Sequence, residues 1–485
     1  MAHVLVVGAG VAGLGSALAL SQQGHRVTVV ERDTTTVPDS PDAAFEQWER
    51  RGAPQVRHSH AFLARLRNLL RDRAPDVLRH LHEAGATEVR FADQPPVTLE
   101  DREPRPGDDD LVALACRRTT FEWVLRRDTL AAGGVRLVEG AVDRLLADGG
   151  PRPGVPHVVG VGLAGAGELP ADAVIDASGV RSSLPEWLTS IGAARVPEKE
   201  KDTGIIYSSR FYRLRPGQQL PPQEGPVLGD LDYLKYAVFV GDNRTFSVTF
   251  GLGAQDAELR RLLRPGPFAS VADTLPGVRR WVEPTRSEPI TGVQAMARLV
   301  NRRRRFVTGE DPVATGVFAV GDSAICTNPL YGRGCSLAMV HAYLLADVLD
   351  QHPSDPVAAA LAFADVTRRE IEPWYTAAVA QDRQARKGLD VPLHDDDEEQ
   401  TVDVETMRSI MRDGLLPAAS TDPIVYRAFI RAFNLLDQPN AIMADAEVVS
   451  RVLAVWQERD QRPPPPALGP DREEMLRILA RTAAA

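Results

Sequence analysis

The sequence predicts an α/β protein in which a parallel-sheet domain is interrupted by an inserted β-sheet domain and followed by a helical C-terminal region. Three patterns indicate this. An apolar strand, a glycine-rich turn and an apolar helix follow one another at the N-terminus, 196–300 alternates as antiparallel strands do, and helical spacing dominates from about Cys335. We expect the parallel-sheet domain over 1–195 and 301–350, the inserted domain over 196–300 and helices over 351–485.

Composition narrows the classes of function. The chain is 44% hydrophobic and 25% charged, as in an ordinary globular protein. Its net charge of -10 argues against nucleic acid as a partner. No apolar stretch is long enough to span a membrane, and the N-terminus lacks the basic start of a secretion signal. The three cysteines show no Cys-x-x-Cys spacing, so we expect a cytoplasmic protein.

The first 31 residues read as a Rossmann-type βαβ unit. We expect a strand at His3–Val7, a helix at Val11–Gln23 and a second strand at Arg26–Val30. Between the first strand and the helix stands a Gly-x-Gly-x-x-Gly motif, and an acidic residue closes the second strand. This context predicts a dinucleotide site.

Each residue of that motif has a physical role. Gly8 permits the tight turn, Gly10 lets the backbone approach a pyrophosphate, and Gly13 lets helix and strand pack closely. The helix N-terminus offers free N–H groups to phosphate. Glu31 would accept hydrogen bonds from the ribose hydroxyls, and we include the neighbouring Arg32 among the cofactor-binding candidates.

Further elements follow at the expected spacing. We predict one helical region from His58 to about Ala84 after a polar loop at Asp33–Asp42, and a turn-rich stretch at Pro95–Asp110. The remaining predictions for the first part of the chain are strands at Leu111–Ala115, Val135–Glu139, Val158–Leu163 and Ala171–Asp176, a helix at Thr120–Ala132 and a loop at Gly149–Pro156.

The second half is predicted more coarsely. The runs Gly204–Leu214 and Ala237–Gly251 indicate antiparallel strands, and Gly316–Val320 indicates a buried strand. Arg302–Arg305 is interpreted as a solvated edge rather than a binding site. The C-terminal predictions are an acidic loop at Asp395–Glu399, an extended linker at Pro463–Pro466 and an amphipathic segment at Arg472–Arg481.

A second motif decides between dinucleotides. The apolar strand Phe318–Val320 ends in Gly321-Asp322 and is followed by Asn328-Pro329-Leu330-Tyr331-Gly332-Arg333-Gly334. This arrangement resembles the flavoprotein monooxygenases of the p-hydroxybenzoate-hydroxylase fold. The resemblance implies bound FAD, with Asp322 at the ribityl chain and with Pro329, Gly332, Arg333 and Gly334 near the flavin ring. A glycine turn that opens a helix also suits the anionic reduced ring.

Two other segments carry the same resemblance. Asp176-Ala177-Ser178-Gly179 is similar to the family's middle motif, which implies that Asp176 and Gly179 lie near the flavin and the pyrophosphate. Arg118 matches an arginine that precedes a helix and reaches FAD. The family's usual Asp-Gly form, with its NADPH-linked arginine, is not evident. Electrons are therefore expected from NAD(P)H either directly or through a separate flavin reductase.

A fourth segment, Pro54–His60, contains Arg57, His58 and His60, which are candidate catalytic residues. Together with 207–212 and 241–246, it most resembles bacterial flavin epoxidases of natural-product pathways, such as those acting on polyether precursors. The two histidines lack the further ligands that a metal site needs, so we expect no metal. A structural or flavin-contacting role and a proton-handling role both remain open.

The resemblance implies a monooxygenase that inserts one oxygen atom from O2 into an apolar organic substrate, by epoxidation or hydroxylation, through a flavin C4a-(hydro)peroxide. Candidate lining residues are Tyr207, Phe211, Tyr236, Phe239 and Phe246. An FAD-dependent dehydrogenase or reductase acting on an alkyl or prenyl chain would fit the same fold. A halogenase is disfavoured because the first lysine is Lys199 and no Trp-x-Trp occurs. A non-catalytic flavoprotein is a further alternative, whereas a plain NAD dehydrogenase would have no use for the motif at Gly321 and Asp322.

Overall fold

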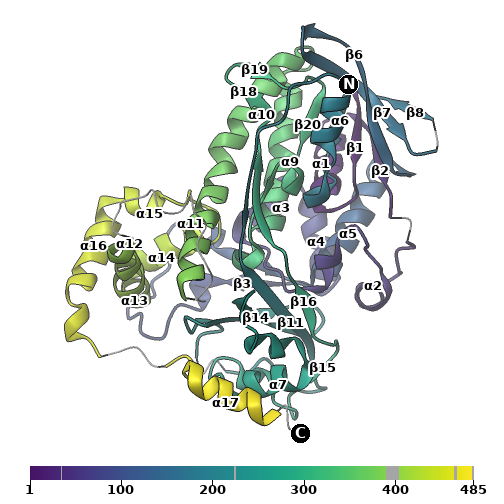
Figure 1. The fold of residues 1–485 in the computed structure, drawn as a ribbon. Helices are drawn as coiled ribbons and strands as arrows, with labels where there is room; N and C mark the ends of the chain where they lie inside the picture. The colour runs from purple at the N-terminus through teal and green to yellow at the C-terminus, as the bar shows by residue number, and fades with distance from the viewer. Residues whose placement is uncertain (34, 166, 223–224, 389–403, 464–466, 483–485) are drawn as a thin grey trace.

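A five-stranded parallel sheet forms the centre of the protein, in the computed structural model that describes residues 1–33, 35–165, 167–222, 225–388, 404–463 and 467–482 (Figure 1). The strand order is β20-β9-β1-β2-β5. Their bounds are His3–Val7 for β1, Arg26–Glu31 for β2, Val135–Glu139 for β5, Ala173–Asp176 for β9 and Val317–Ala319 for β20. Most of their buried residues are apolar, because one face packs against helices and the other packs largely against an antiparallel β-meander. The predicted α/β fold is confirmed.

Helix α1 (Val11–Gln22) packs against α9 (Gly334–Gln351) and α5 (Arg118–Ala131). The two helices approach closely at Gly15, where an added Cβ would lie 2.7 Å from Met339 Sδ and the Met339 side chain would have to move. The βαβ unit is thus formed as the sequence predicts. The carboxyl ends of β1, β9 and β20 all lead into turns that carry the predicted motifs, and these ends are the usual ligand-binding edge of such a sheet.

The segment after β2 differs from the prediction in two places. The expected helical region from His58 to Ala84 consists of two helices, α3 (Ala64–Arg73) and α4 (Pro75–Glu83), because Pro75 has no N–H and starts a new helix. The expected polar loop at Asp33–Asp42 ends in a further helix, α2 (Pro41–Gln47), which Ser40 caps by accepting a hydrogen bond from Ala43 N–H.

Two small antiparallel units flank the parallel sheet. β3 (Thr87–Arg90) pairs with β4 (Val112–Ala115). β6 (Val142–Arg152), β7 (Val155–Leu163) and β8 (Glu168–Pro170) form a meander between β5 and β9. The predicted loop at Gly149–Pro156 is wrong in extent, because the β6–β7 hairpin continues to a tight turn at Pro153 and Gly154.

The inserted region forms a six-stranded antiparallel sheet. Its strands are β11 (Ile205–Leu214), β12 (Leu228–Asp230), β13 (Leu234–Val240), β14 (Thr245–Gly253), β15 (Ser287–Pro289) and β16 (Gln294–Met296). The predicted run Ala237–Gly251 is divided between β13 and β14. Its turn is sharp, with Asn243 and Arg244 at φ 49° and 62°.

The two faces of this inserted sheet have different partners. Even-numbered residues of β11, β13 and β14 enter a hydrophobic core formed with α7 (Pro265–Thr274), α8 (Arg279–Val282) and α17 (Arg472–Thr482). Figure 1 shows α17 lying beside α7 at this outer face. Odd-numbered residues face the parallel-sheet domain, because successive strand residues point to opposite faces. The predicted amphipathic C-terminal segment is therefore a helix of the inserted sheet's core.

The interpretation of the basic run as a solvated edge is wrong. Residues 302–304 belong to β17 (Val300–Arg304), the central strand between β10 (Glu198–Asp202) and β21 (Ile325–Cys326). Arg302 and Arg304 are 14% and 6% exposed and pair with Glu200 and Glu198 at 2.7 and 2.6 Å. The acidic residues of β10 neutralise Arg302 and Arg304 across the strands, and Glu372 pairs with the other two arginines of the run. A second short pair, β18 (Val307–Thr308) and β19 (Asp311–Pro312), follows.

The chain after Cys335 is mainly helical, as predicted. After α9 come α10 (Pro356–Glu370), α11 (Glu372–Gly388), α12 (Val404–Ser409), α13 (Leu416–Thr421), α14 (Pro423–Phe433), α15 (Ala441–Ala444) and α16 (Ala446–Gln457). Within the described ranges, no helix is long and apolar enough to cross a membrane. The predicted acidic loop at Asp395–Glu399 and most of the Pro463–Pro466 linker lie outside the described residues.

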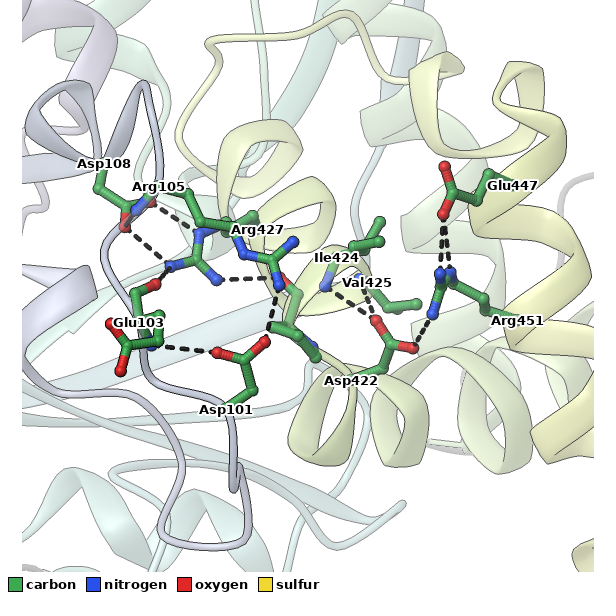
Figure 2. A network of polar contacts seen from close by, with 11 residues as sticks. Asp101, Glu103, Arg105, Asp108, Asp422, Ile424, Val425, Arg427, Glu447 and Arg451 are labelled. Carbon is green, nitrogen blue, oxygen red and sulfur yellow. Dashed lines mark hydrogen bonds and ion pairs between the residues drawn. The ribbon is translucent and has the colours of Figure 1, made fainter.

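Helix α14 connects the C-terminal region to the predicted turn-rich stretch at Pro95–Asp110 (Figure 2). Arg427 donates to both carboxylate oxygens of Asp108 at 2.8 Å and to the Glu103 carbonyl at 3.0 Å. Asp422 caps α14 and also accepts from Arg451 of α16 at 2.7 Å. The helices therefore fix a segment that has little secondary structure of its own.

Candidate functional site

In the glycine turn after β1, one of the three glycines leaves its backbone open to the approach of a ligand. Gly8 has φ 100°, and a Cβ there would lie 2.8 Å from the Ala177 carbonyl oxygen. A Cβ on Gly13 would lie 1.9 Å from the Gly8 oxygen, whereas one on Gly10 would meet no atom within 4 Å. Gly8 and Gly13 therefore serve packing, and only Gly10 presents bare backbone to free space at the start of α1.

Glu31 lies beside this turn, where its Oε2 accepts a hydrogen bond from Ala9 N–H at 2.8 Å. Arg50 donates to the Ala9 carbonyl at 3.1 Å, and its side chain is 4% exposed. The Nε and Nη1 groups of Arg50 make no hydrogen bond, but they form ion pairs with Asp33 at 3.8 Å and with Glu122 at 3.3 Å. Because these ion pairs lack hydrogen-bond geometry, Arg50 keeps donor capacity beside the turn. Sequence reasoning missed Arg50, because it lies in an ordinary polar stretch without a motif.

Arg118 and His60 are linked. Arg118 donates to the fully buried Glu122 at 2.7 Å and to His60 Nε2 at 3.1 Å. His60 Nδ1 must donate to the His58 carbonyl, 2.9 Å away, so Nε2 is the acceptor of a neutral ring. Burial and the Arg118 charge hold the pKa of His60 well below its usual range. His60 therefore orients Arg118.

The second turn lies directly against the first. Gly321 has φ 66°, and a Cβ there would lie 2.9 Å from the Ala12 Cβ in α1. Its N–H donates to Nδ1 of the buried His341 at 3.2 Å. Asp322 is half-buried and makes no hydrogen bond to the described residues; burial raises its pKa, and Arg118 opposes that rise. A carboxylate without a protein partner, beside Arg118, is available to a ligand.

The carboxylate of Asp176 stabilises the turn that follows it in the chain. Asp176 accepts from the Ser178 hydroxyl and the Ser182 hydroxyl, both at 2.5 Å, and from Ser178 N–H at 3.1 Å. Burial raises the pKa of Asp176, and these donors act against the rise. The carboxylate therefore shapes the turn internally. Gly179, at φ 82°, would carry a Cβ with no atom within 4 Å.

The segment Asn328–Gly334 passes from β21 to α9. Gly332 has φ 65°, and a Cβ there would lie 2.7 Å from the Ala61 Cβ, so the loop contacts the segment that follows His60. Arg333 is buried between Tyr331 and Trp374, whose ring centroids lie 4.7 and 5.0 Å from the guanidinium carbon. Burial lowers the pKa of Arg333 to about 10. Pro329 and Gly334 are exposed on the same loop.

The five predicted lining residues are distributed over the two faces of the inserted sheet. Tyr207 and Phe211 are buried on the face toward the parallel-sheet domain: Tyr207 donates to Asn328 Oδ1 at 2.7 Å, and Phe211 contacts Phe45 with centroids 5.0 Å apart. Phe239 also has an odd number in its strand, so it lies on the same face, and it is half-buried. The prediction for the two others is corrected. Tyr236 and Phe246 lie on the opposite face, in the core under α7, because they have even parity in their strands.

A row of hydroxyls runs along the same inner face. Ser59 donates to Ser247 at 2.7 Å and lies 2.5 Å from Thr249, which lies 2.9 Å from Ser209; His58 Nδ1 is 3.4 Å from Ser209. Since each hydroxyl has one proton, Thr249 must donate to Ser59 and Ser209 to Thr249, which leaves His58 Nδ1–H as the donor to Ser209. His58 Nε2 makes no hydrogen bond to the described residues. Burial lowers the pKa of His58 to about 4.

Two predicted residues lie apart from this arrangement. Arg57 donates to the Glu46 carbonyl at 3.1 Å, on the C-terminal part of α2. Arg32 is exposed. A surface cavity of about 400 Å³ lies elsewhere, between the β6–β7 hairpin and Ile191, and contains none of the predicted residues. Among the described residues, no three of the His, Cys, Asp and Glu side chains are grouped to hold a metal ion.

A comparison with known protein families identifies the cofactor class that this site suits. The family described as FAD dependent oxidoreductase matches residues 3–348. The chain belongs to this family. Both glycine turns, Arg118 and the Asn328–Gly334 loop fall within the matched segment. The segment that matches this family thus includes the inserted sheet and most of α9.

Similar proteins support the same fold over nearly the whole chain. Protein Rv3254 of Mycobacterium tuberculosis is 28% identical over 494 residues, which cover 95% of this chain and 96% of that protein. Among solved structures, the flavin-dependent brominase Bmp2 is similar with a TM-score of 0.60 at 16% identity, covering 95% of this chain and 99% of that one. The pqsL protein of Pseudomonas aeruginosa, a probable FAD-dependent monooxygenase, has a TM-score of 0.57 at 17% identity, covering 80% and 97%.

A further structural neighbour is the anhydrotetracycline hydroxylase OxyS of Streptomyces rimosus, with a TM-score of 0.55 at 17% identity, covering 90% of this chain and 76% of that one. The described residues themselves also fit an FAD. Three features lie along one edge of the parallel sheet: open space over Gly10, the Arg50 donors that make no hydrogen bond, and the carboxylate of Asp322. A dinucleotide requires such an alternation of donors, bare backbone and acceptors.

Proposed function

We propose that the FAD-dependent oxidoreductase is a monooxygenase that inserts one oxygen atom of O2 into a largely apolar small organic molecule, by epoxidation or hydroxylation. The observation that carries the proposal is the contact between Tyr207 and Asn328. It joins the inner face of the inserted sheet to the loop proposed to lie against the flavin ring. A substrate held on that face would therefore be presented to the ring.

The cofactor roles follow from the site. Gly10 and the start of α1 would receive the pyrophosphate, Arg50 and Arg118 would neutralise it, and Glu31 would bind the adenosine ribose. Asp322 would accept from the ribityl hydroxyls. Gly332 and Gly334, beside the N-terminus of α9, would bring backbone N–H groups to the ring. Gly8, Gly13, Asp176 and His60 would act by shaping the turns and orienting Arg118.

Bound FAD, once reduced, supplies the electrons that activate oxygen. The chain must then exclude water and orient the substrate. Phe211 packs against Phe45, and Tyr207 is buried further along the same strand, so the inner face carries buried apolar surface. The hydroxyl row and the unpartnered His58 Nε2 lie on the same face, so we propose that an oxygen-bearing group of the substrate is oriented there. His58 is neutral at pH 7 and can accept a hydrogen bond.

The resemblance to epoxidases, and neighbours such as the hydroxylase OxyS, support a substrate from natural-product metabolism. The electron donor is proposed to be NAD(P)H, used directly or through a flavin reductase. Both routes can be compared by following flavin bleaching without oxygen, with NADPH or NADH alone and then with a flavin reductase added. Bleaching by NAD(P)H alone would indicate direct use.

Stopped-flow absorbance tests the proposed activity. The protein is reduced chemically without oxygen and then mixed with oxygenated buffer. A transient near-ultraviolet band before the oxidised flavin spectrum returns supports oxygen activation on the flavin. Incorporation of 18O from 18O2 into a product completes the assignment. Reoxidation without a transient, together with unlabelled but desaturated or saturated product, would replace the proposal by a dehydrogenase or reductase of alkyl or prenyl chains.

A further inference from the structure

A closed ring of hydrogen bonds surrounds Asp382 at the base of the Asn328–Gly334 loop. Asp382 belongs to α11 and is 4% exposed. Its Oδ2 accepts from Asn301 Nδ2 and its Oδ1 from Asn328 Nδ2, both at 2.6 Å. Asn328 N–H donates to Asn301 Oδ1 at 2.7 Å, which closes the ring. Three segments distant in the sequence therefore meet at one carboxylate.

The orientation of both amides is fixed by the backbone. Asn301 Oδ1 must accept from Asn328 N–H, and Asn328 Oδ1 must accept from Leu330 N–H at 3.0 Å, because a backbone N–H can only donate. Each Nδ2 group consequently points at Asp382. The ring is complete only with two carboxylate acceptors, so a proton on Asp382 would face an N–H donor and break one bond.

Asn328 transmits this constraint to the loop. Besides Asp382, it binds Tyr207 of the inserted sheet and caps the turn Pro329–Tyr331 through Leu330 N–H. That turn ends at Gly332, whose conformation is fixed against Ala61. Loss of the Asn328 position would therefore move the loop, the first turn of α9 and the sheet contact together.

Several charged or titratable groups surround the carboxyl. They are Arg386 on α11, Arg333 and Tyr331 on the loop, and Tyr207 on β11. Burial raises the pKa of Asp382 to about 6, against the opposing effects of the two Asn amides and of the Arg386 and Arg333 charges. Both phenols have raised pKa values through burial and remain neutral. Asp382 is thus the group of this set that changes charge near neutral pH.

We propose that Asp382 is a positioning residue for FAD: its ionised carboxylate holds Asn328, and through Asn328 the loop, in the geometry that receives the flavin ring. The inference rests on the proposed position of FAD and not on oxygen insertion. It predicts that affinity for FAD depends on the charge of a residue that need not touch the cofactor.

The test measures FAD dissociation constants from pH 5 to 8, by quenching of flavin fluorescence in the full-length protein. The wild-type protein should bind FAD about 10-fold more weakly at pH 5 than at pH 7.5, with a midpoint near 6. Asp382→Asn should bind weakly at all pH values, with no transition near 6. Asp365→Asn, a surface carboxylate of α10, is the matched control and should keep the wild-type profile.

A second variant separates positioning from a general structural role. Asn301→Ala removes one donor to the carboxylate and also the acceptor of Asn328 N–H, while the bond from Asn328 Nδ2 to Asp382 is kept. With one donor fewer, the carboxylate is less stabilised and the midpoint should move to higher pH. Circular dichroism of each apoprotein establishes folding. A wild-type profile in folded Asp382→Asn, or an unmoved midpoint in Asn301→Ala, would overturn the proposal. Since neither substrate nor oxygen is present, failure of the monooxygenase proposal would leave these results unaffected.

Discussion

Arg117 and Asp242 form a fully buried ion pair between the residue that precedes α5 and the β13–β14 turn. Arg117 Nη2 lies 2.5 Å from Asp242 Oδ2, and Arg117 N–H donates to Oδ1 at 2.6 Å. Arg117 Nε and the Thr120 hydroxyl also donate to this carboxylate, at 3.0 and 2.8 Å. Neither side chain is exposed. The pair joins the inserted sheet to the parallel-sheet domain and fixes the β13–β14 turn beside the start of α5.

Asp242→Ala should lower the free energy of unfolding by about 3 kcal/mol, because the buried Arg117 loses its fully buried partner and keeps only Asp42, 2.5 Å from Nη2. Chemical denaturation at pH 7 measures this loss. Asp365→Ala, which removes an exposed pair with Arg368, should cost less than about 1 kcal/mol. Equal losses in the two variants would contradict the role assigned to the buried pair.

The parts of the fold that depend on local pattern could be predicted from the sequence. The β1-α1-β2 unit, the glycine turns and the helical C-terminal region are encoded by neighbouring residues, and the structure forms them. The inner face of the inserted sheet was harder to predict. Tyr207 and Tyr236 look alike in sequence, but register places Tyr207 against Asn328 and Tyr236 under α7. Which face of the sheet a residue occupies depends on strand register, and register is set by packing between distant segments.

Other residues could not be found from the sequence at all. Arg50 is significant only because its donors are buried beside Ala9, 41 positions away in the chain. Asp382 is significant only because Asn301 and Asn328 point at it, 81 and 54 positions away. Neither residue lies in a recognisable motif. Long-range hydrogen bonds of this kind require coordinates.

Gly10→Ala should weaken FAD binding about 10-fold or more and leave the apoprotein's stability nearly unchanged. The added Cβ meets no protein atom within 4 Å, so its cost would come from the ligand alone. Isothermal titration with FAD measures the loss. Gly133→Ala is the control, because that Cβ also meets open space but lies at the far end of α5. Equal affinities in both variants would place the pyrophosphate elsewhere.

Asp322→Asn should weaken FAD binding by about 10- to 100-fold, the usual effect of losing a charged acceptor. The apoprotein should not be destabilised, since Asp322 makes no hydrogen bond to the described residues and burial raises its pKa. Flavin content after purification and apoprotein melting are the two measurements. Full flavin occupancy in the variant would remove Asp322 from the proposed site.

His341→Leu should show a pH-dependent loss of stability. His341 accepts from Gly321 N–H and lies 2.9 Å from the Thr367 hydroxyl, so removing it leaves a buried donor unpaired, at a cost of about 1–3 kcal/mol at pH 8. Burial lowers the pKa of His341 to about 3. The wild-type protein therefore loses stability as pH falls below about 6.5, because the unfolded state binds a proton that the folded state excludes.

The variant lacks that histidine, so its deficit should shrink on acidification. Each pH unit below about 6.5 changes the difference by up to about 1.4 kcal/mol, and at pH 5 the gap should be smaller by about 2 kcal/mol. Urea denaturation of both apoproteins at pH 8, 6.5 and 5 measures the gap. A gap that stays constant over this range would mean that His341 gains its proton as readily in the folded as in the unfolded protein, and the Gly321 turn would then need another acceptor at pH 5.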